Sequence, residues 1–204
     1  MPLVKKVFIE NYAVWGIWQI DENIDQLHEF LATLGVSYSC LHIQAVEKRK
    51  ESLAARALAH VLARDIQLNT GKIVLDRWGS PCWECATAAL SLSHTRGFAA
   101  AFIHCSATSC GIDIERPTPR LLKVATRVFS PQELAWADNR IEQLTVLWCA
   151  KEALYKWYKV GHLDFRTHIA VHLQDHPIRG LVHHLQPHLQ YVYSEPLVVA
   201  YCWL

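Results

Sequence analysis

The sequence has no apolar run long enough to cross a bilayer, which takes about 20 residues. It also lacks a Gly/Ser-rich linker, a low-complexity segment and a block of like charges. The net charge is only +1, so bulk charge does not predict binding to nucleic acid. Residues 1–6 lack a signal-peptide pattern, because the two lysines follow the apolar residues. We therefore expect a cytoplasmic protein that binds neither nucleic acid nor membrane.

The seven cysteines are too few and too scattered for an evident zinc motif. Only Cys82 and Cys85 form a C-x-x-C pair, and a structural zinc site needs four Cys or His ligands. Histidines could supply the other two. His183 and His184 are poor candidates, since adjacent residues of a strand point to opposite faces. Reduced, mostly buried cysteines are the simpler interpretation, and a zinc module on Cys82 and Cys85 stays open as an alternative.

The order of predicted elements indicates an α+β protein. With 204 residues, 51% of them apolar and 19% charged, the chain can bury a substantial core in one domain or two small ones. The first two strands flank a predicted turn at Glu10-Asn11. Apolar periodicity predicts strands near 3–9, 12–18, 72–76, 89–93, 98–104, 110–115, 168–174, 181–185, 189–194 and 197–203, and helices over 21–34, 47–67 and 140–159.

Two helix ends carry local signals. Gly35 ends the helix that Asp21 opens. Ser130 and Glu133 are spaced as a capping box, with Pro131 at the first helical position. A further helix is therefore predicted to begin at Pro131.

Two short segments carry the chemistry. In residues 111–115, G-I-D-I-E, a strand places Asp113 and Glu115 on one face and the isoleucines on the other. In residues 148–156, W-C-A-K-E-A-L-Y-K, Glu152 and Lys156 are four apart and share a helix face. Three acids and two lysines in two short segments suggest a divalent cation that grips a phosphate.

Simpler interpretations of these residues exist. Asp113 and Glu115 alone could be the solvent face of an amphipathic strand, and Glu152 with Lys156 a surface salt bridge. If the three carboxylates converge to about 4 Å, however, each pair repels by roughly 4 kcal/mol at an effective dielectric near 20. Protonation, a basic partner or a cation must then compensate. Hard oxygen ligands select Mg²⁺ or Ca²⁺.

These segments resemble the 4'-phosphopantetheinyl transferases. The pair G-I-D-I-E and W-x-x-K-E-A-x-x-K is the signature of that family, and the match is closest to its larger, single-chain class, which activates carrier domains of synthetases. Three further segments are similar and come in the same order: Gly79–Pro81, Leu92–Thr95 and Phe129–Glu133. The resemblance covers roughly residues 75–165.

The resemblance implies two similar α/β halves related by a pseudo-twofold axis, each with a small, mainly antiparallel sheet packed on helices. On that ground the chain divides into residues 1–110 and 111–204, with the site in the cleft between the halves and a monomer as the working unit. The implied activity is Mg²⁺-dependent transfer of 4'-phosphopantetheine from coenzyme A to a serine of an acyl or peptidyl carrier protein, with release of 3',5'-ADP.

The resemblance also implies roles for single residues. Mg²⁺ would be held by Asp113, Glu115 and Glu152, and Glu152 would be either the general base or a pure ligand. Lys156 would contact the phosphates and assist the leaving group. The remaining coenzyme A contacts would come from His94 at the 3'-phosphate, from Lys151 and, less specifically, from Arg49 and Arg56.

The chain departs from the family at two places. Ser80 stands where G-K-P has a lysine, which removes one positive group expected near the cofactor. Trp157 and Tyr158 are bulkier than the glycine-rich segment that often follows the second lysine, so contact with the carrier protein could differ. The loss at Ser80 leaves an alternative open: a catalytically weak protein of the same fold that binds coenzyme A or carrier proteins.

Overall fold

The structure is a computed structural model that describes residues 3–10, 12–175 and 177–204. It divides into two compact units, Met1–Ala107 and Thr108–Leu204. Each unit has its own sheet and its own apolar core. The division that the sequence predicted, after residue 110, stays a proposal. Asn11, the second residue of the predicted turn, lies outside the described residues.

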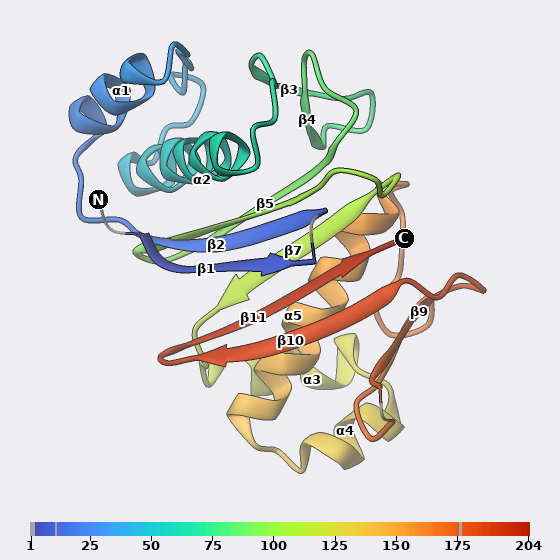
Figure 1. Cartoon of the computed structure of the whole chain (residues 1–204). Coiled ribbons are helices and arrows are strands. Elements are labelled where there is room, and N and C mark those ends of the chain that lie inside the picture. Colours follow the sequence, from blue (N-terminus) through green and yellow to red (C-terminus); the bar gives the residue numbers. More distant parts are fainter. Residues whose placement is uncertain (1–2, 11, 176) are drawn as a thin grey trace. The chain divides into compact units, whose positions relative to one another are not determined.

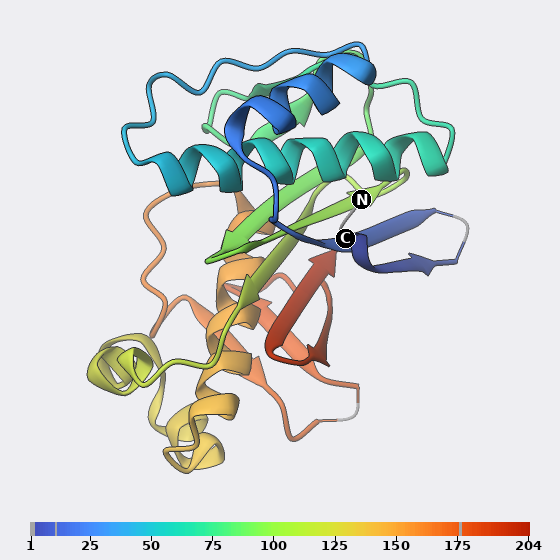
Figure 2. The same cartoon turned by 90° about the vertical axis from the view of Figure 1, so that its left-hand side faces the viewer.

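The first unit is a four-stranded antiparallel sheet with two helices on one of its faces (Figure 2). The strand order is β1-β2-β6-β5, and a separate hairpin pairs β3 with β4. The elements are β1 Leu3–Ile9, β2 Ala13–Gln19, α1 Ile24–Thr33, α2 Val46–Asp65, β3 Ile73–Leu75, β4 Pro81–Trp83, β5 Ala89–Thr95 and β6 Phe98–His104.

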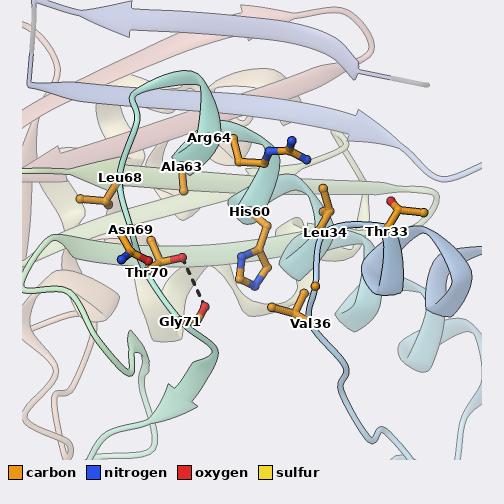
Figure 3. Close-up of a pocket in the computed structure, with 11 residues that line it drawn as sticks. Thr33, Leu34, Val36, His60, Ala63, Arg64, Leu68, Asn69, Thr70 and Gly71 are labelled. Carbon is orange, nitrogen blue, oxygen red and sulfur yellow. Dashed lines mark hydrogen bonds between the residues drawn. The ribbon is translucent and has the colours of Figure 1, made fainter.

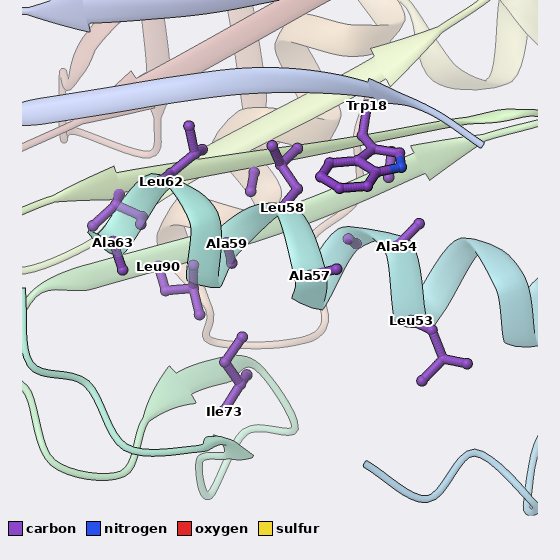
Figure 4. Close-up of a cluster of buried hydrophobic side chains, with 14 of the residues drawn as sticks. Trp18, Leu53, Ala54, Ala57, Leu58, Ala59, Leu62, Ala63, Ile73 and Leu90 are labelled. Carbon is purple, nitrogen blue, oxygen red and sulfur yellow. The ribbon is translucent and has the colours of Figure 1, made fainter. Parts of the chain in front are cut away.

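The core of the first unit lies between α2 and this sheet. Leu58 and Leu62 point from α2 toward the strand that carries Trp18, and all three side chains are buried (Figure 4). Alanines fill many of the other inward positions of α2 and of β6. Small side chains allow the helix to lie close to the sheet.

The second unit is a five-stranded antiparallel sheet with one long helix against a face of it (Figure 1). The strand order is β7-β11-β10-β9-β8. The elements are β7 Cys110–Glu115, α3 Arg120–Val128, α4 Pro131–Ala137, α5 Ile141–Tyr158, β8 Ile169–His172, β9 Arg179–Val182, β10 His188–Ser194 and β11 Leu197–Trp203. Helix α5 packs on β7 and β11 and reaches β8 and β9.

The α+β class, with a small antiparallel sheet and helices in each half, is confirmed. Gly35 ends α1 at a φ of 77°, as predicted. The helix begins at Ile24 rather than near Asp21, because Asn23 caps it: its side chain accepts from the N–H of Gln26, whose own side chain accepts from the N–H of Asn23.

Other boundaries differ from the predictions for local reasons. The sequence did not predict α3, which has no side-chain cap at its N-terminus. Residues 81–83, which lie outside the predicted strands, form the short strand β4. Among the described residues, no helix is long and apolar enough to span a membrane.

Candidate active site

Strand β7 and helix α5 approach each other unusually closely at Gly111. A Cβ atom on Gly111 would lie 1.9 Å from the carbonyl oxygen of Ala153 and 2.9 Å from the nitrogen of Trp157. The hydroxyl of Ser109 also donates to the carbonyl of Trp157, at 2.5 Å. The backbone of α5 therefore rests directly on β7, with no side chain of the strand between them.

This contact brings the acidic face of β7 against α5. Gly111, Asp113 and Glu115 alternate along the strand and so share one face. Asp113 pairs with Ala200 of β11 and is only 4% exposed, whereas Glu115 is half-buried. Burial of Asp113 excludes the simpler interpretation of this segment as a solvent-facing amphipathic strand.

Lys156 of α5 meets Asp113. Its ammonium donates to the Oδ1 atom of Asp113 at 2.7 Å and to the carbonyl of Ile112 at 3.0 Å. The Lys156 side chain is 28% exposed, against 6% for that of Asp113, so this ion pair is partly accessible from solvent. Lys156 of the helix thus pairs with an acid of the strand.

Glu152 lies in the electric field of both strand acids. Burial, followed by the negative charge of Asp113, raises the pKa of Glu152 to about 7, with a smaller contribution from Glu115 and an opposing one from Lys156. A carboxyl group with a pKa near neutrality can take up a proton during a reaction at physiological pH. The same mutual repulsion is what a bound cation would relieve.

Cys149, one turn before Glu152, is a buried thiol in the same surroundings. Burial and then the charge of Asp113 raise its pKa well above its usual value, and its Sγ atom lies 3.6 Å from the carbonyl oxygen of Val198. A thiol held neutral is a poor nucleophile. The chemistry of this site therefore depends on carboxylates and lysine.

Asp113, Glu115 and Glu152 are the residues that could hold a hard divalent cation, because all three offer carboxylate oxygens. Within residues 3–10, 12–175 and 177–204, however, no three Asp, Glu, His or Cys side chains stand close enough together to hold a metal ion as they are placed. Lys156 compensates the charge of Asp113 in this arrangement. The same observation gives no support to a zinc site on Cys82 and Cys85.

Lys151 is buried and ion-paired in this structure. Its side chain is 0% exposed and forms an ion pair of 2.9 Å with Glu133 of α4. It also donates to the carbonyls of Phe165 and Ile169, at 2.6 and 2.7 Å. Three acceptors occupy the three protons of an ammonium group. In this structure these partners surround the Lys151 ammonium, and its contact with a phosphate stays a prediction.

Glu133 holds three segments at this point. Its Oε2 atom accepts from the N–H of Ser130, which completes the predicted capping box, and its Oε1 atom accepts from the N–H of Val171. The carboxylate is 4% exposed and pairs with Lys151. The Phe129–Glu133 segment thus joins α4, α5 and β8 through one buried carboxylate.

In the first unit, His94 near the end of β5 contacts Glu51 of α2. The Nδ1 atom of His94 lies 3.0 Å from Oε2 of Glu51, and the ammonium of Lys48 lies 2.7 Å from the same oxygen. The side chain of Glu51 is 6% exposed, while those of His94 and Lys48 are 35% and 56% exposed. Two accessible nitrogen-bearing side chains therefore gather on one buried carboxylate.

Arg49 and Arg56, the predicted phosphate contacts of α2, are not part of this cluster. At 100° per residue they lie about 160° and 140° around the helix from Glu51. Arg49 donates to the carbonyl of Ile43, and Arg56 donates to Ser52 and lies 5.5 Å from the ring of Tyr38. The structure brings Lys48, rather than either arginine, to His94.

Two family models match this sequence, one in each unit. Residues 109–202 match the family model of the 4'-phosphopantetheinyl transferase superfamily. Residues 40–104 match the model of the 4'-phosphopantetheinyl transferase N-terminal domain. The chain belongs to the 4'-phosphopantetheinyl transferase superfamily. No curated protein matches the sequence.

The two matches fall on the two structural units, as in the larger single-chain class of these transferases. Domains of this superfamily transfer phosphopantetheine and generally use coenzyme A and a divalent metal. The match to the second unit contains Asp113, Glu115, Glu152 and Lys156, and the match to the first contains Glu51 and His94.

Two departures from the family pattern have a structural setting. Ser80 lies in the turn between β3 and β4, where its N–H donates to Asp76, and Arg77 of this turn stacks on the exposed Trp78. Trp157 is only 5% exposed within the core of the second unit. Trp157 therefore packs in the core and adds little to the surface of the transferase.

The first unit also contains a pocket of about 560 Å³ at the C-terminal ends of α1 and α2 (Figure 3). His60 points into this region beside Thr70 and Leu34. Its Nε2 atom lies 2.7 Å from the hydroxyl of Tyr38, and burial lowers its pKa to about 4. A neutral imidazole in this position fixes Tyr38, which also accepts from the N–H of Ile73. None of the predicted site residues lines this pocket.

The sequence pattern was not used to identify Glu51 as a candidate, although the position of Glu51 in the helix indicates that it is buried. Glu51 lies three and seven residues before Ala54 and Leu58, and therefore on the apolar stripe of α2. An acid on such a stripe must be paired when buried. Glu133 was predicted only as a helix cap; its ion pair with Lys151 had no sequence signal.

Replacing Gly111 with alanine is expected to destabilise the transferase and to lower its activity. The added Cβ would overlap the backbone of Ala153, which a helix cannot relieve by a side-chain rotation, so α5 must move from β7. Overpacking of this kind lowers the free energy of unfolding by about 1–3 kcal/mol or more. Urea denaturation measures the first effect, and transfer to a carrier protein measures the second.

Gly161→Ala is the matched control, because nothing lies within 4 Å of a Cβ at that position. Equal stability of the two alanine variants would contradict the close approach of α5 to β7.

Proposed function

We propose that this protein transfers the 4'-phosphopantetheine group of coenzyme A to a serine hydroxyl of an acyl or peptidyl carrier protein and releases 3',5'-ADP. The observation that carries this proposal is Glu152, an acid with a pKa of about 7 beside the buried Asp113 and its partner Lys156. Membership of the superfamily supports the reaction class. The carrier protein, the metal and the leaving group are the finer parts of the proposal.

Asp113, Glu115 and Glu152 would hold Mg²⁺ in this proposal. Carboxylate oxygens are donors that a hard cation prefers, and the negative charges of Asp113 and Glu115 add to burial in raising the pKa of Glu152. When bound, Mg²⁺ supplies neutralisation of the pyrophosphate charge.

Glu152 is the candidate general base. The serine oxygen of the carrier protein forms a bond to the β-phosphorus, and the bond from that phosphorus to the bridging oxygen breaks, which frees 3',5'-ADP. The serine proton passes to the carboxylate of Glu152, directly or through one water. General-base catalysis of this kind contributes about 10²–10⁴-fold to a rate.

Lys156 would stabilise the departing phosphate. Its ammonium is partly exposed and is carried by a flexible side chain. It can therefore leave Asp113 for a phosphate oxygen once another positive charge compensates the negative charge of Asp113. A positive charge near the bridging oxygen favours the leaving group most when the bond is broken.

His94 and Lys48 would bind the 3'-phosphate of coenzyme A. Both side chains are accessible, and both present nitrogen donors from the cluster on Glu51. We propose further that the working protein is a monomer in the cytoplasm. The alternative, a coenzyme A- or carrier-binding protein with weak catalysis, depends on Ser80 in place of the expected lysine.

The test is a panel of apo carrier proteins incubated with coenzyme A, Mg²⁺ and the purified protein. We expect at least one carrier to gain the mass of one phosphopantetheine group, and omission of Mg²⁺ to abolish the gain. Cofactor binding by calorimetry without modification of any carrier would favour the weakly catalytic alternative.

A further inference from the structure

The pocket of about 560 Å³ in the first unit contains none of the residues assigned above to phosphopantetheine transfer (Figure 3). Its volume is within the range of sites that bind small organic molecules, about 300–1,000 Å³. The half-buried side chains of Leu34, Val36 and Leu68 give it apolar walls. Such sites combine an apolar lining with a few polar groups that fix the ligand, and His60 and Arg64 offer these groups here.

Hydrogen bonds around His60 leave one of its ring nitrogens for a ligand. The N–H of Ile73 donates to the hydroxyl of Tyr38 at 2.6 Å, so the hydroxyl proton is available for the Nε2 atom of His60, 2.7 Å away. When Nε2 accepts, the proton of a neutral imidazole is on Nδ1. Burial lowers the pKa of His60 to about 4, which keeps the ring neutral.

The Nδ1 atom of His60 faces the pocket. It has no hydrogen-bond partner in the part of the chain that the structure describes, and it is not sealed from solvent. Figure 3 shows the ring projecting from α2 between Thr70 and Val36. An N–H group in this position can donate to an oxygen of a bound molecule.

Arg64 lies one turn after His60 on the same face of α2. Its side chain is exposed and forms no ion pair or hydrogen bond with another described residue. Among the eleven lining residues, all of them described, Arg64 alone carries a formal charge. A guanidinium group presents a fork of donors that matches the two oxygens of a carboxylate.

We propose that this pocket binds a small organic acid whose carboxylate lies between the guanidinium of Arg64 and the Nδ1–H of His60. The apolar part of the molecule lies against Leu34, Val36 and Leu68. The proposed site is independent of the transfer reaction, because its residues take no part in that reaction.

The charge around the pocket favours a monoanion over a dianion. Helices α1 and α2 both end here, at Thr33 and Asp65, and each helix C-terminus carries a partial charge of about −0.5. Together these partial charges are about equal and opposite to the charge of Arg64. A carboxylate can pair directly with the guanidinium, whereas a phosphate brings a second negative charge close to the helix ends. Asp65 itself is paired with Lys6 at 2.6 Å.

The experiment titrates the ¹⁵N-labelled full chain with phenylacetate and with phenylacetamide, its neutral analogue of the same shape, and follows the backbone amides by NMR. Phenylacetate is expected to cause saturable shifts at Leu68, Thr70 and Gly71. The amide is expected to bind about tenfold more weakly, because it lacks the charge-assisted hydrogen bonds to Arg64. Phenyl phosphate is expected to bind more weakly than phenylacetate.

Arg64→Gln is expected to weaken binding of phenylacetate by about tenfold and to leave the affinity for the amide unchanged. Arg127→Gln is the matched control, because Arg127 is also an exposed arginine in the last turn of a helix. Arg64→Lys keeps the charge but loses the fork, so a smaller loss is expected. Thermal denaturation shows that the variants are folded, and a long-range ¹H–¹⁵N spectrum is expected to place the proton of His60 on Nδ1.

The outcomes separate this site from the proposed function. Absence of saturable shifts, shifts confined to residues outside the pocket, or equal affinity for the acid and the amide overturns the site. Arg64→Gln with no greater effect than Arg127→Gln, tighter binding of phenyl phosphate, or a proton on Nε2 of His60 overturns the proposed recognition of a carboxylate. A protein that binds phenylacetate here and modifies no carrier supports the site and rejects the transfer reaction.

Discussion

Glu152→Gln is expected to lower kcat/KM for transfer to a carrier protein by about 10²–10⁴-fold, the range of a lost general base. The amide keeps the shape of the side chain but can neither accept the serine proton nor serve as an anionic metal ligand. Glu142→Gln is the matched control, because Glu142 is an exposed acid in the first turn of the same helix. Equal activity of the two variants would remove Glu152 from the mechanism.

The pH dependence of the wild-type protein tests the same residue. Because the pKa of Glu152 is raised to about 7, its carboxylate form predominates above that pH and is lost below it. At limiting Mg²⁺, kcat/KM is expected to fall about tenfold per pH unit below pH 7. The residual activity of Glu152→Gln is expected to lack this limb; a wild-type profile flat from about pH 5 to pH 8 would contradict the assignment.

The stability of Glu152→Gln follows from the same pKa with its sign worked out. A carboxyl group whose folded-state pKa is above its unfolded value binds its proton more tightly in the folded state. Its contribution to stability is therefore fully present below pH 4.5 and is lost as the pH rises through about 7. At pH 8 the glutamine variant is expected to be at least as stable as the wild type, so a loss of activity there is not a loss of fold.

Lys151→Met is expected to lower the free energy of unfolding by about 3–5 kcal/mol, the usual effect of breaking a buried ion pair. The change leaves Glu133, which is 4% exposed, as an uncompensated buried charge, and leaves the carbonyls of Phe165 and Ile169 without their ammonium donor. Urea denaturation monitored by circular dichroism measures the difference. Lys123→Met, at an exposed position of α3, is the control and is expected to change stability little.

A second substitution tests the cause of this loss. Glu133→Gln in the Lys151→Met background removes the charge but keeps an oxygen and a similar shape, so part of the stability is expected to return. A Lys151→Met protein that is fully stable but no longer binds coenzyme A would instead support the original prediction that Lys151 contacts a phosphate.

Much of the fold follows from local patterns in the sequence. Ile169, Val171 and Leu173 alternate with polar residues, and the structure buries all three. The capping box of Ser130 and Glu133 marks where α4 begins. These predictions succeed because periodicity and capping depend on neighbours within a few residues.

The candidate site was predictable only in part. The sequence pattern identified Asp113, Glu152 and Lys156, and the structure brings these three side chains together. It did not indicate the buried ion pair of Lys151 with Glu133, since a helix position gives a direction but does not say which acid lies there. It also did not indicate that Lys48 and His94 share Glu51, because the pairing of His94 with Glu51 joins residues 43 positions apart along the chain.

The sequence by itself determined which residue type occupies each position of β7 and α5. It therefore determined which acids and lysines share a face of the strand or of the helix. Only the tertiary structure decided which lysine is buried with Glu133 and which is left accessible beside Asp113. The physical reason is the packing of α5: its contact with Gly111 turns Lys156 toward the strand, and the same packing turns Lys151 into the interior, where only a buried carboxylate and backbone carbonyls can receive its charge.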